Sequence, residues 1–105
     1  MSQFQSGFVN EAKDLLESLE SALLTLESDF GDQEMIAEVF RVMHSLKGTA
    51  SMFGFNRVGQ LTHDLETIYD LIRGGKLTLS ESILTASLSA LDLIHNLLDD
   101  SDLKN

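Results

Sequence analysis

Residues 33–55 read QEMIAEVFRVMHSLKGTASMFGF, and this stretch carries the pattern that decides the fold. Its apolar residues recur at alternating spacings of three and four positions, which is the repeat of one face of an α-helix. We therefore predict a helix over 33–53 that ends at Gly54, after which Phe55 packs back on the core. The residues expected on its buried face are Ile36, Val39, Met43, Leu46, Ala50 and Phe53.

The same spacing continues on both sides of this stretch and predicts further amphipathic helices over about 4–30, 57–73 and 79–100. Their predicted buried faces consist of Phe8, Ala12, Leu15, Leu19, Ala22 and Leu26, widened by Leu16, Leu23 and Phe30; of Val58, Leu61, Leu65, Ile68 and Ile72; and of Leu84, Leu88, Leu91, Ile94 and Leu98.

Glycines mark the breaks between the helices, at Gly31, Gly54 and Gly74-Gly75. Short connections between helices favour antiparallel neighbours, so we predict an all-α fold, an antiparallel up-down-up-down four-helix bundle. A coiled coil has similar spacing, but the glycine breaks argue against one long helix. We expect a single domain over 1–105, in which 101–105 form a frayed end or the start of a linker. The helix caps expected are Asp32, Asn56 and Thr78.

Composition excludes several classes of protein. The chain has 105 residues and no cysteine, so a disulfide scaffold and Cys-ligated metal sites are ruled out. It also has no proline, which favours helices. Its net charge of −10 offers no basic footprint for nucleic acid and would be repelled by anionic lipid. The acidic surface either keeps the domain in solution or steers a basic partner surface towards it. Apolar runs are too short to insert in a membrane and no secretory signal is present, so we expect a cytoplasmic protein.

A strip of unusual residues lies beside the buried face of the 33–53 helix. His44 falls one step off that face, together with Phe40, Lys47, Gly48 and Ser51. A glycine inside a helix costs about 1 kcal/mol relative to alanine, so helix stability does not explain Gly48. We expect Gly48 and Ser51 to leave room for another protein to close over the imidazole, as a docking surface.

A histidine and a glutamate follow on the next helix, where His63 and Glu66 are three positions apart. Adjacent antiparallel helices would bring them to His44 and Lys47. This set suggests phosphoryl transfer through a histidine, because a neutral imidazole nitrogen is a good nucleophile near neutral pH. Glu66 would accept the N–H of the other ring nitrogen and fix the tautomer, while Lys47 would neutralise phosphoryl oxygens.

The segment HSLKGTASMFGF at 44–55 resembles the signature of histidine-containing phosphotransfer (HPt) domains, in particular the N-terminal domain of CheA-type chemotaxis histidine kinases. The family's motif reads approximately H-S-[LI]-K-G-x-[AG]-G-x-F-G-F, and a histidine and a glutamate follow it on the next helix. His63 and Glu66 stand at the matching places. One departure is Ser51, where the family usually has glycine; serine is small, so access to the histidine should survive.

The resemblance implies a role for each matching residue. His44 would be the phosphorylated histidine, Glu66 would hold and polarise its ring, and Lys47 and His63 would belong to the surrounding polar network. The donor would be ATP bound by a separate CheA-type kinase domain acting in trans. The acceptor would be an aspartate of a response-regulator receiver domain that is CheY- or CheB-like. The domain would then need no cofactor of its own and would act as a phosphoryl carrier, a part of a histidine protein kinase.

Three other interpretations stay open at this point. The chain could be a free-standing HPt protein of a phosphorelay. It could be a helical interaction module with no phosphoryl chemistry. Four-helix bundles also bind metals or haem through inward Glu-x-x-His pairs, but here His63-x-x-Glu66 occurs once and in reverse order. Since the predicted buried faces carry no carboxylates, we expect no metal.

Overall fold

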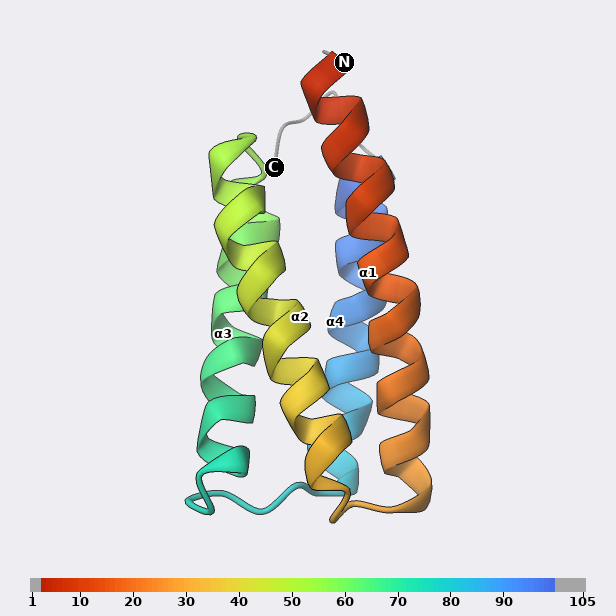
Figure 1. Ribbon diagram of the computed structural model, residues 1–105, viewed down its shortest axis with the longest axis vertical. Helices are drawn as coiled ribbons and strands as arrows, with labels where there is room; N and C mark the ends of the chain where they lie inside the picture. The colour runs from red at the N-terminus through yellow and green to blue at the C-terminus, as the bar shows by residue number, and fades with distance from the viewer. Residues whose placement is uncertain (1–2, 100–105) are drawn as a thin grey trace.

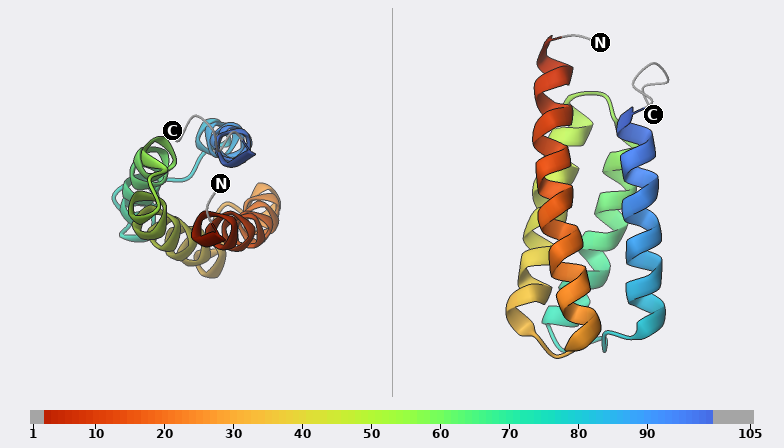
Figure 2. Two further views of the ribbon diagram at one scale, coloured as in Figure 1. Left: turned by 90° about the horizontal axis from the view of Figure 1, so that it is seen from above. Right: turned by 90° about the vertical axis from the view of Figure 1, so that its right-hand side faces the viewer.

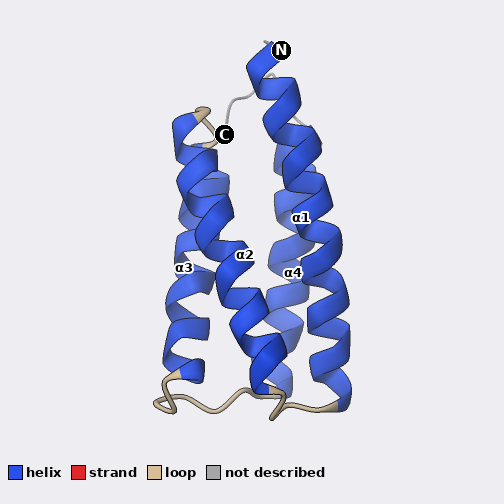
Figure 3. Ribbon diagram, in the orientation of Figure 1, coloured by secondary structure: helices blue, strands red, loops and turns tan. Residues whose placement is uncertain are grey.

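Four helices form the computed structural model of this chain, which describes residues 3–99 and their side chains from residue 7 onward (Figure 1). The predicted all-α class is confirmed, since the described residues contain helices and connections but no strand (Figure 3). Each helix bound lies within two residues of the predicted one, and the frayed end or linker expected over 101–105 falls outside the described residues. The helices are α1 (Gln3–Ser28), α2 (Gln33–Met52), α3 (Asn56–Arg73) and α4 (Glu81–Asp99).

Consecutive helices run antiparallel, and the chain goes around the bundle in order (Figure 2). α2 packs most extensively against α3, α1 contacts both α2 and α4, and α4 closes the ring against α3. This is the predicted up-down-up-down bundle. Among the described residues, no helix is long and apolar enough to cross a membrane.

The buried face of α3 is rotated from the predicted one. Leu61 and Ile68 are only partly buried, whereas Thr62 and Tyr69 are fully buried. Their polar atoms are satisfied inside the bundle, because the Tyr69 hydroxyl lies 2.8 Å from Ser87 Oγ of α4 and the Thr62 hydroxyl donates to a backbone carbonyl one turn earlier. A count of apolar residues alone could not find this face.

The turn between α2 and α3 is the one that places the site. Gly54 has a φ of +86°, a left-handed conformation that glycine adopts without steric cost, and it ends α2 as predicted. Phe55 follows and is 1% exposed, so it anchors the turn in the core. The chain therefore reverses within three residues and returns α3 along the side of α2.

Two of the three predicted caps are wrong. Asp32 does cap α2, since its side chain accepts a hydrogen bond from the Met35 N–H at 3.1 Å. Asn56 is instead the first residue of α3, and no side chain caps that helix. Thr78 lies too early, because Ser80 Oγ accepts from the Ile83 N–H at 3.3 Å and α4 begins at Glu81.

Phe30 does not widen the buried face of α1 as predicted. α1 ends at Ser28, and Asp29 Oδ1 accepts a hydrogen bond from the Gly31 N–H at 3.0 Å, which folds the chain into a turn. Phe30 lies in this turn with 40% of its surface exposed.

Candidate functional site

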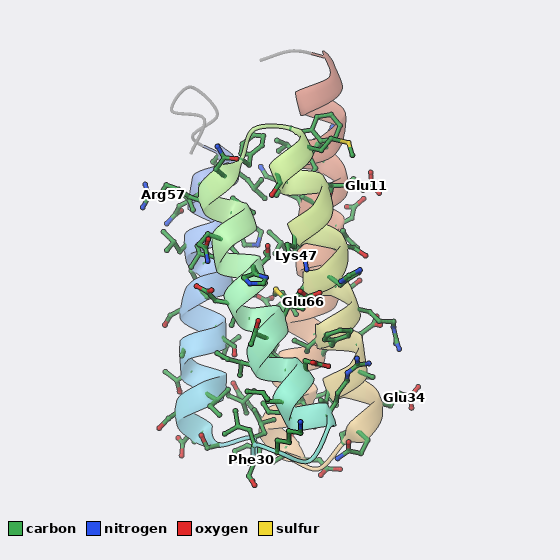
Figure 4. The ribbon with its side chains drawn as sticks, turned by 90° about the vertical axis from the view of Figure 1, so that its left-hand side faces the viewer. Glu11, Phe30, Glu34, Lys47, Arg57 and Glu66 are labelled. Carbon is green, nitrogen blue, oxygen red and sulfur yellow. The ribbon has the colours of Figure 1, made fainter. Side chains whose placement is uncertain are left out.

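Lys47 of α2 and Glu66 of α3 lie close together on the side of the bundle where these two helices pack against each other (Figure 4). Met43 and Leu46 are almost completely buried and anchor this part of α2. His44 follows Met43 on the helix and therefore points away from the core, with 65% of its side chain exposed. From α3, Glu66 reaches the same place with only 10% of its side chain exposed.

Glu66 is the centre of the polar contacts. Its Oε2 is hydrogen bonded to His44 Nδ1, and its Oε1 accepts a hydrogen bond from Lys47 Nζ at 2.5 Å. His63 Nδ1 lies 3.9 Å from Oε1, which is too long for a direct hydrogen bond. The structure thus brings all four predicted residues together, with His63 at the periphery and 55% exposed.

The charge state of Glu66 follows from these contacts. Burial raises the pKa of its carboxyl, but the hydrogen bonds and charges of Lys47 and His44 outweigh burial and hold the pKa below the ordinary value of 4.5. Glu66 is therefore ionised near neutral pH and can only accept hydrogen bonds. His44 Nδ1 must then carry the proton, and the lone pair of a neutral ring lies on Nε2.

Acid should weaken the fold through Glu66. Since its pKa is lower in the folded chain, its contribution to the free energy of unfolding is complete above about pH 4.5 and is lost as the pH falls through the folded pKa. We expect the difference in unfolding free energy between the wild type and Glu66→Gln to shrink from about pH 7 to about pH 3. Urea denaturation at the two pH values measures it. Glu17→Gln, at an exposed position of α1, serves as the control, and an unchanged Glu66→Gln difference would contradict the ionised carboxylate.

The two small residues beside His44 differ in their surroundings. Gly48 is exposed, and a Cβ placed on it would meet no atom within 4 Å, so the surface there is open. Ser51 is also exposed, but its Oγ lies 2.8 Å from the point where a Cβ on Gly59 would be. Gly59 is buried and allows α3 to approach α2 at this point. One sequence feature indicates this contact, namely a glycine in the interior of the helix predicted over 57–73.

Two further side chains join the site. The ring of Phe40 stacks on the imidazole of His44, with centroids 6.1 Å apart and planes at 19°. The guanidinium carbon of Arg73, in the last turn of α3, lies 3.8 Å from the centroid of the Phe40 ring. Helical spacing predicts Phe40 on the same strip as His44, whereas it gives no indication of Arg73, because the contact of Arg73 crosses between helices.

No group of three or more histidine, cysteine, aspartate or glutamate residues able to hold a metal ion is found in the part of the chain that the structure describes. The expectation that the buried faces carry no carboxylate is wrong, because Glu66 is 8% exposed. Lys47 and His44 are hydrogen bonded to its two oxygens, and these bonds offset the free-energy cost of burying a carboxylate.

Comparisons with known proteins show the family and the fold of this chain. The family model described as "Hpt domain" matches residues 3–103. The structure superposes on the CheA phosphotransferase domain from Thermotoga maritima with a TM-score of 0.89 at 35% identity, covering 94% of this chain and 96% of that one. A computationally redesigned four-helix bundle also gives a TM-score of 0.89, but at 18% identity it shares the fold alone.

Curated relatives are chemotaxis proteins. CheA of Bacillus subtilis is 32% identical over 97% of this chain, and CheA of Salmonella typhimurium is 35% identical over 94% of it. The alignments cover 16% and 15% of those proteins, so the chain spans only a small part of their length. On the family match and the matched phosphotransferase domain, the chain belongs to the Hpt domain family, the phosphotransfer modules of two-component signalling.

Proposed function

We propose that His44 carries a phosphoryl group from ATP, bound on a separate CheA-type kinase domain, to an aspartate of a response-regulator receiver domain. The observation that supports this most is the pairing of an ionised, buried Glu66 with His44 Nδ1 and Lys47 at once. The pairing leaves Nε2 as the nucleophilic nitrogen of an exposed ring. An exposed nucleophile suits a reaction in which another protein brings the second substrate.

The proposed transfer proceeds in two displacements. Nε2 attacks the γ-phosphorus of ATP, the N–P bond forms, the bond to the β,γ-bridging oxygen breaks, and ADP leaves. The ring gains positive charge, which the Glu66 carboxylate stabilises through the Nδ1 proton. An aspartate oxygen of the receiver then attacks the phosphorus, the N–P bond breaks, and His44 returns to its neutral form.

Lys47 and His63 would have supporting roles in this proposal. Lys47 Nζ lies on the same carboxylate as His44 and its side chain is 32% exposed, so its charge is near the incoming phosphoryl oxygens. His63 contributes at most a longer electrostatic contact to Glu66. The kinase domain and the receiver domain as partners, the cytoplasmic location and the extent of the domain over 1–105 all belong to this proposal. So does the place of the domain within a longer CheA-type kinase, which the length of the matched relatives supports.

The proposal is tested by incubating the domain with a CheA-type kinase core and ³²P-labelled ATP, and then adding a receiver domain. Label should appear on the domain as a base-stable, acid-labile phosphoramidate and then move to the receiver. A folded domain that stays unlabelled with several kinase cores would overturn the proposal.

Gly48→Ala should separate stability from function. Replacing a helical glycine by alanine should raise the free energy of unfolding by roughly 0.5–1 kcal/mol, and no neighbouring atom opposes the added methyl group. If the open surface is clearance for the partner, the same methyl should slow phosphorylation by about fivefold or more. Urea denaturation and initial labelling rates measure the two effects.

Gly7→Ala is the matched control, because Gly7 is an exposed glycine of α1 with no atom within 4 Å of the added Cβ. It should stabilise the domain and leave the labelling rate unchanged. A Gly48→Ala domain that is labelled as fast as the wild type would remove Gly48 from the docking surface.

A further inference from the structure

Phe40 has no part in the proposed transfer, yet it touches the reacting ring. It lies one helical turn before His44 on α2 and is half-buried against the core. Its ring is nearly parallel to the imidazole, with planes at 19° and centroids 6.1 Å apart. Such an offset, parallel arrangement is a favoured geometry between flat rings.

The imidazole needs a second contact besides its hydrogen bond. The bond from Nδ1 to Glu66 fixes one atom of the ring, but the ring can still turn about that bond. Displacement at phosphorus requires the Nε2 lone pair, which lies in the ring plane, to point along the line of attack. A flat neighbour at the face of the ring restricts its plane and therefore the direction of that lone pair.

Phe40 is in turn held by α3. The Arg73 guanidinium carbon lies 3.8 Å from the Phe40 centroid, within the range of a cation–π contact. Arg73 Nε donates a hydrogen bond to Asp70 Oδ1 at 2.9 Å, which orients the guanidinium. A continuous set of contacts therefore runs from the last turn of α3, through Phe40, to the ring of His44.

We propose that Phe40 and Arg73 are positioning residues for His44: Arg73 holds the Phe40 ring, and Phe40 sets the plane of the imidazole. Together with Glu66, they would fix both the proton and the direction of the attacking lone pair. The inference deepens the proposed function and rests on it for the kinetic effect, while the contact itself can be tested in the free domain.

Arg73→Ala is the informative variant, because it leaves the Phe40 side chain intact and removes only the cation–π contact that holds its ring. In NMR spectra of the free domain we expect weaker contacts between the His44 and Phe40 ring protons and a changed ring-current shift at His44. With the kinase core, the maximal labelling rate should fall about two- to fivefold at an unchanged KM, the range expected for an exposed cation–π contact. Arg73→Lys should recover part of both effects.

Arg41→Ala is the matched control, since Arg41 is an exposed arginine of α2 that pairs with Glu38 rather than with Phe40. It should change neither the His44 signals nor the rate. Phe40→Leu should lower the maximal rate at least as much as Arg73→Ala. If Arg73 acts through Phe40, adding Arg73→Ala to Phe40→Leu should cause no further loss.

The inference is overturned if the His44 signals of free Arg73→Ala match those of the wild type, or if the variant raises KM and leaves the maximal rate intact. The second result would mean that Arg73 contacts the partner instead. An unlabelled wild-type domain would overturn the proposed function, and the NMR comparison would still decide whether Arg73 holds the stacked rings.

Discussion

A His44→Gln domain is expected to take up no phosphoryl group while keeping its fold. Glutamine places an amide nitrogen where the imidazole nitrogen stands, and this amide nitrogen has no free lone pair to attack phosphorus. Labelling by the kinase core should therefore fall by more than about 10³-fold, as expected when the nucleophile itself is removed. The side chain is 65% exposed, so the free energy of unfolding should change by only about 0.5 kcal/mol. Labelling with ³²P-ATP and thermal unfolding followed by circular dichroism measure the two quantities.

The other two histidines supply the controls for this variant. His95→Gln changes a half-buried residue of α4 that lies on a different helix from the site. His63→Gln removes only a contact of 3.9 Å to Glu66. Both variants should still be labelled to completion. A His44→Gln domain that carries acid-labile phosphate would show that a different residue is the acceptor.

Glu66→Ala is expected to leave a folded domain that is phosphorylated slowly. Without the carboxylate, nothing holds the proton on Nδ1 or offsets the positive charge that develops on the ring. Loss of the group that orients a metal-bound histidine typically costs 10–100-fold in affinity or activity, and we expect a rate loss of about that size here. Single-turnover labelling measures it. In parallel, ¹⁵N spectra of the ring should show less of the Nδ1–H tautomer of His44 than in the wild type.

Asp64→Ala is a matched control for Glu66→Ala, because Asp64 is an exposed carboxylate of the same helix that accepts a hydrogen bond from Gln60. It should leave both the rate and the tautomer unchanged. A Glu66→Ala domain labelled at the wild-type rate would remove Glu66 from the mechanism, whatever its geometry in the unphosphorylated domain.

Much of the fold could be predicted because the helical repeat is unbroken along the chain. The spacing of Ile36, Val39, Met43, Leu46 and Ala50 requires a helix with one buried face, and all five are buried in the structure. Leucine-rich helices separated by glycine breaks leave few arrangements other than an antiparallel bundle.

The predictions of the buried face of α3 and of two helix caps are wrong, because polar atoms or helix ends decide these features. Tyr69 and Thr62 are buried through hydrogen bonds, which a count of apolar residues does not detect. Ser80 rather than Thr78 caps α4. A serine and a threonine two positions apart offer the same hydroxyl group to the start of a helix, so the sequence pattern alone could not choose between them.

The site could be predicted only in part, for a related reason. Helical spacing places His44 beside Lys47 and His63 beside Glu66, since each pair lies on one helix. Contacts between helices depend on how the helices are aligned along each other, and the sequence pattern does not determine this register. The Phe40–Arg73 contact and the approach of Ser51 to Gly59 are both of this kind.

The position of phosphate on the imidazole tests the proposed chemistry most directly. The contact of Glu66 with Nδ1 leaves Nε2 as the only ring nitrogen with a lone pair to attack phosphorus. In a domain with ¹⁵N-labelled histidine, phosphorylated by the kinase core, the ³¹P–¹⁵N coupling identifies the bonded nitrogen. We expect the coupling at Nε2 of His44. A coupling at Nδ1, or at a histidine other than His44, would contradict the proposal.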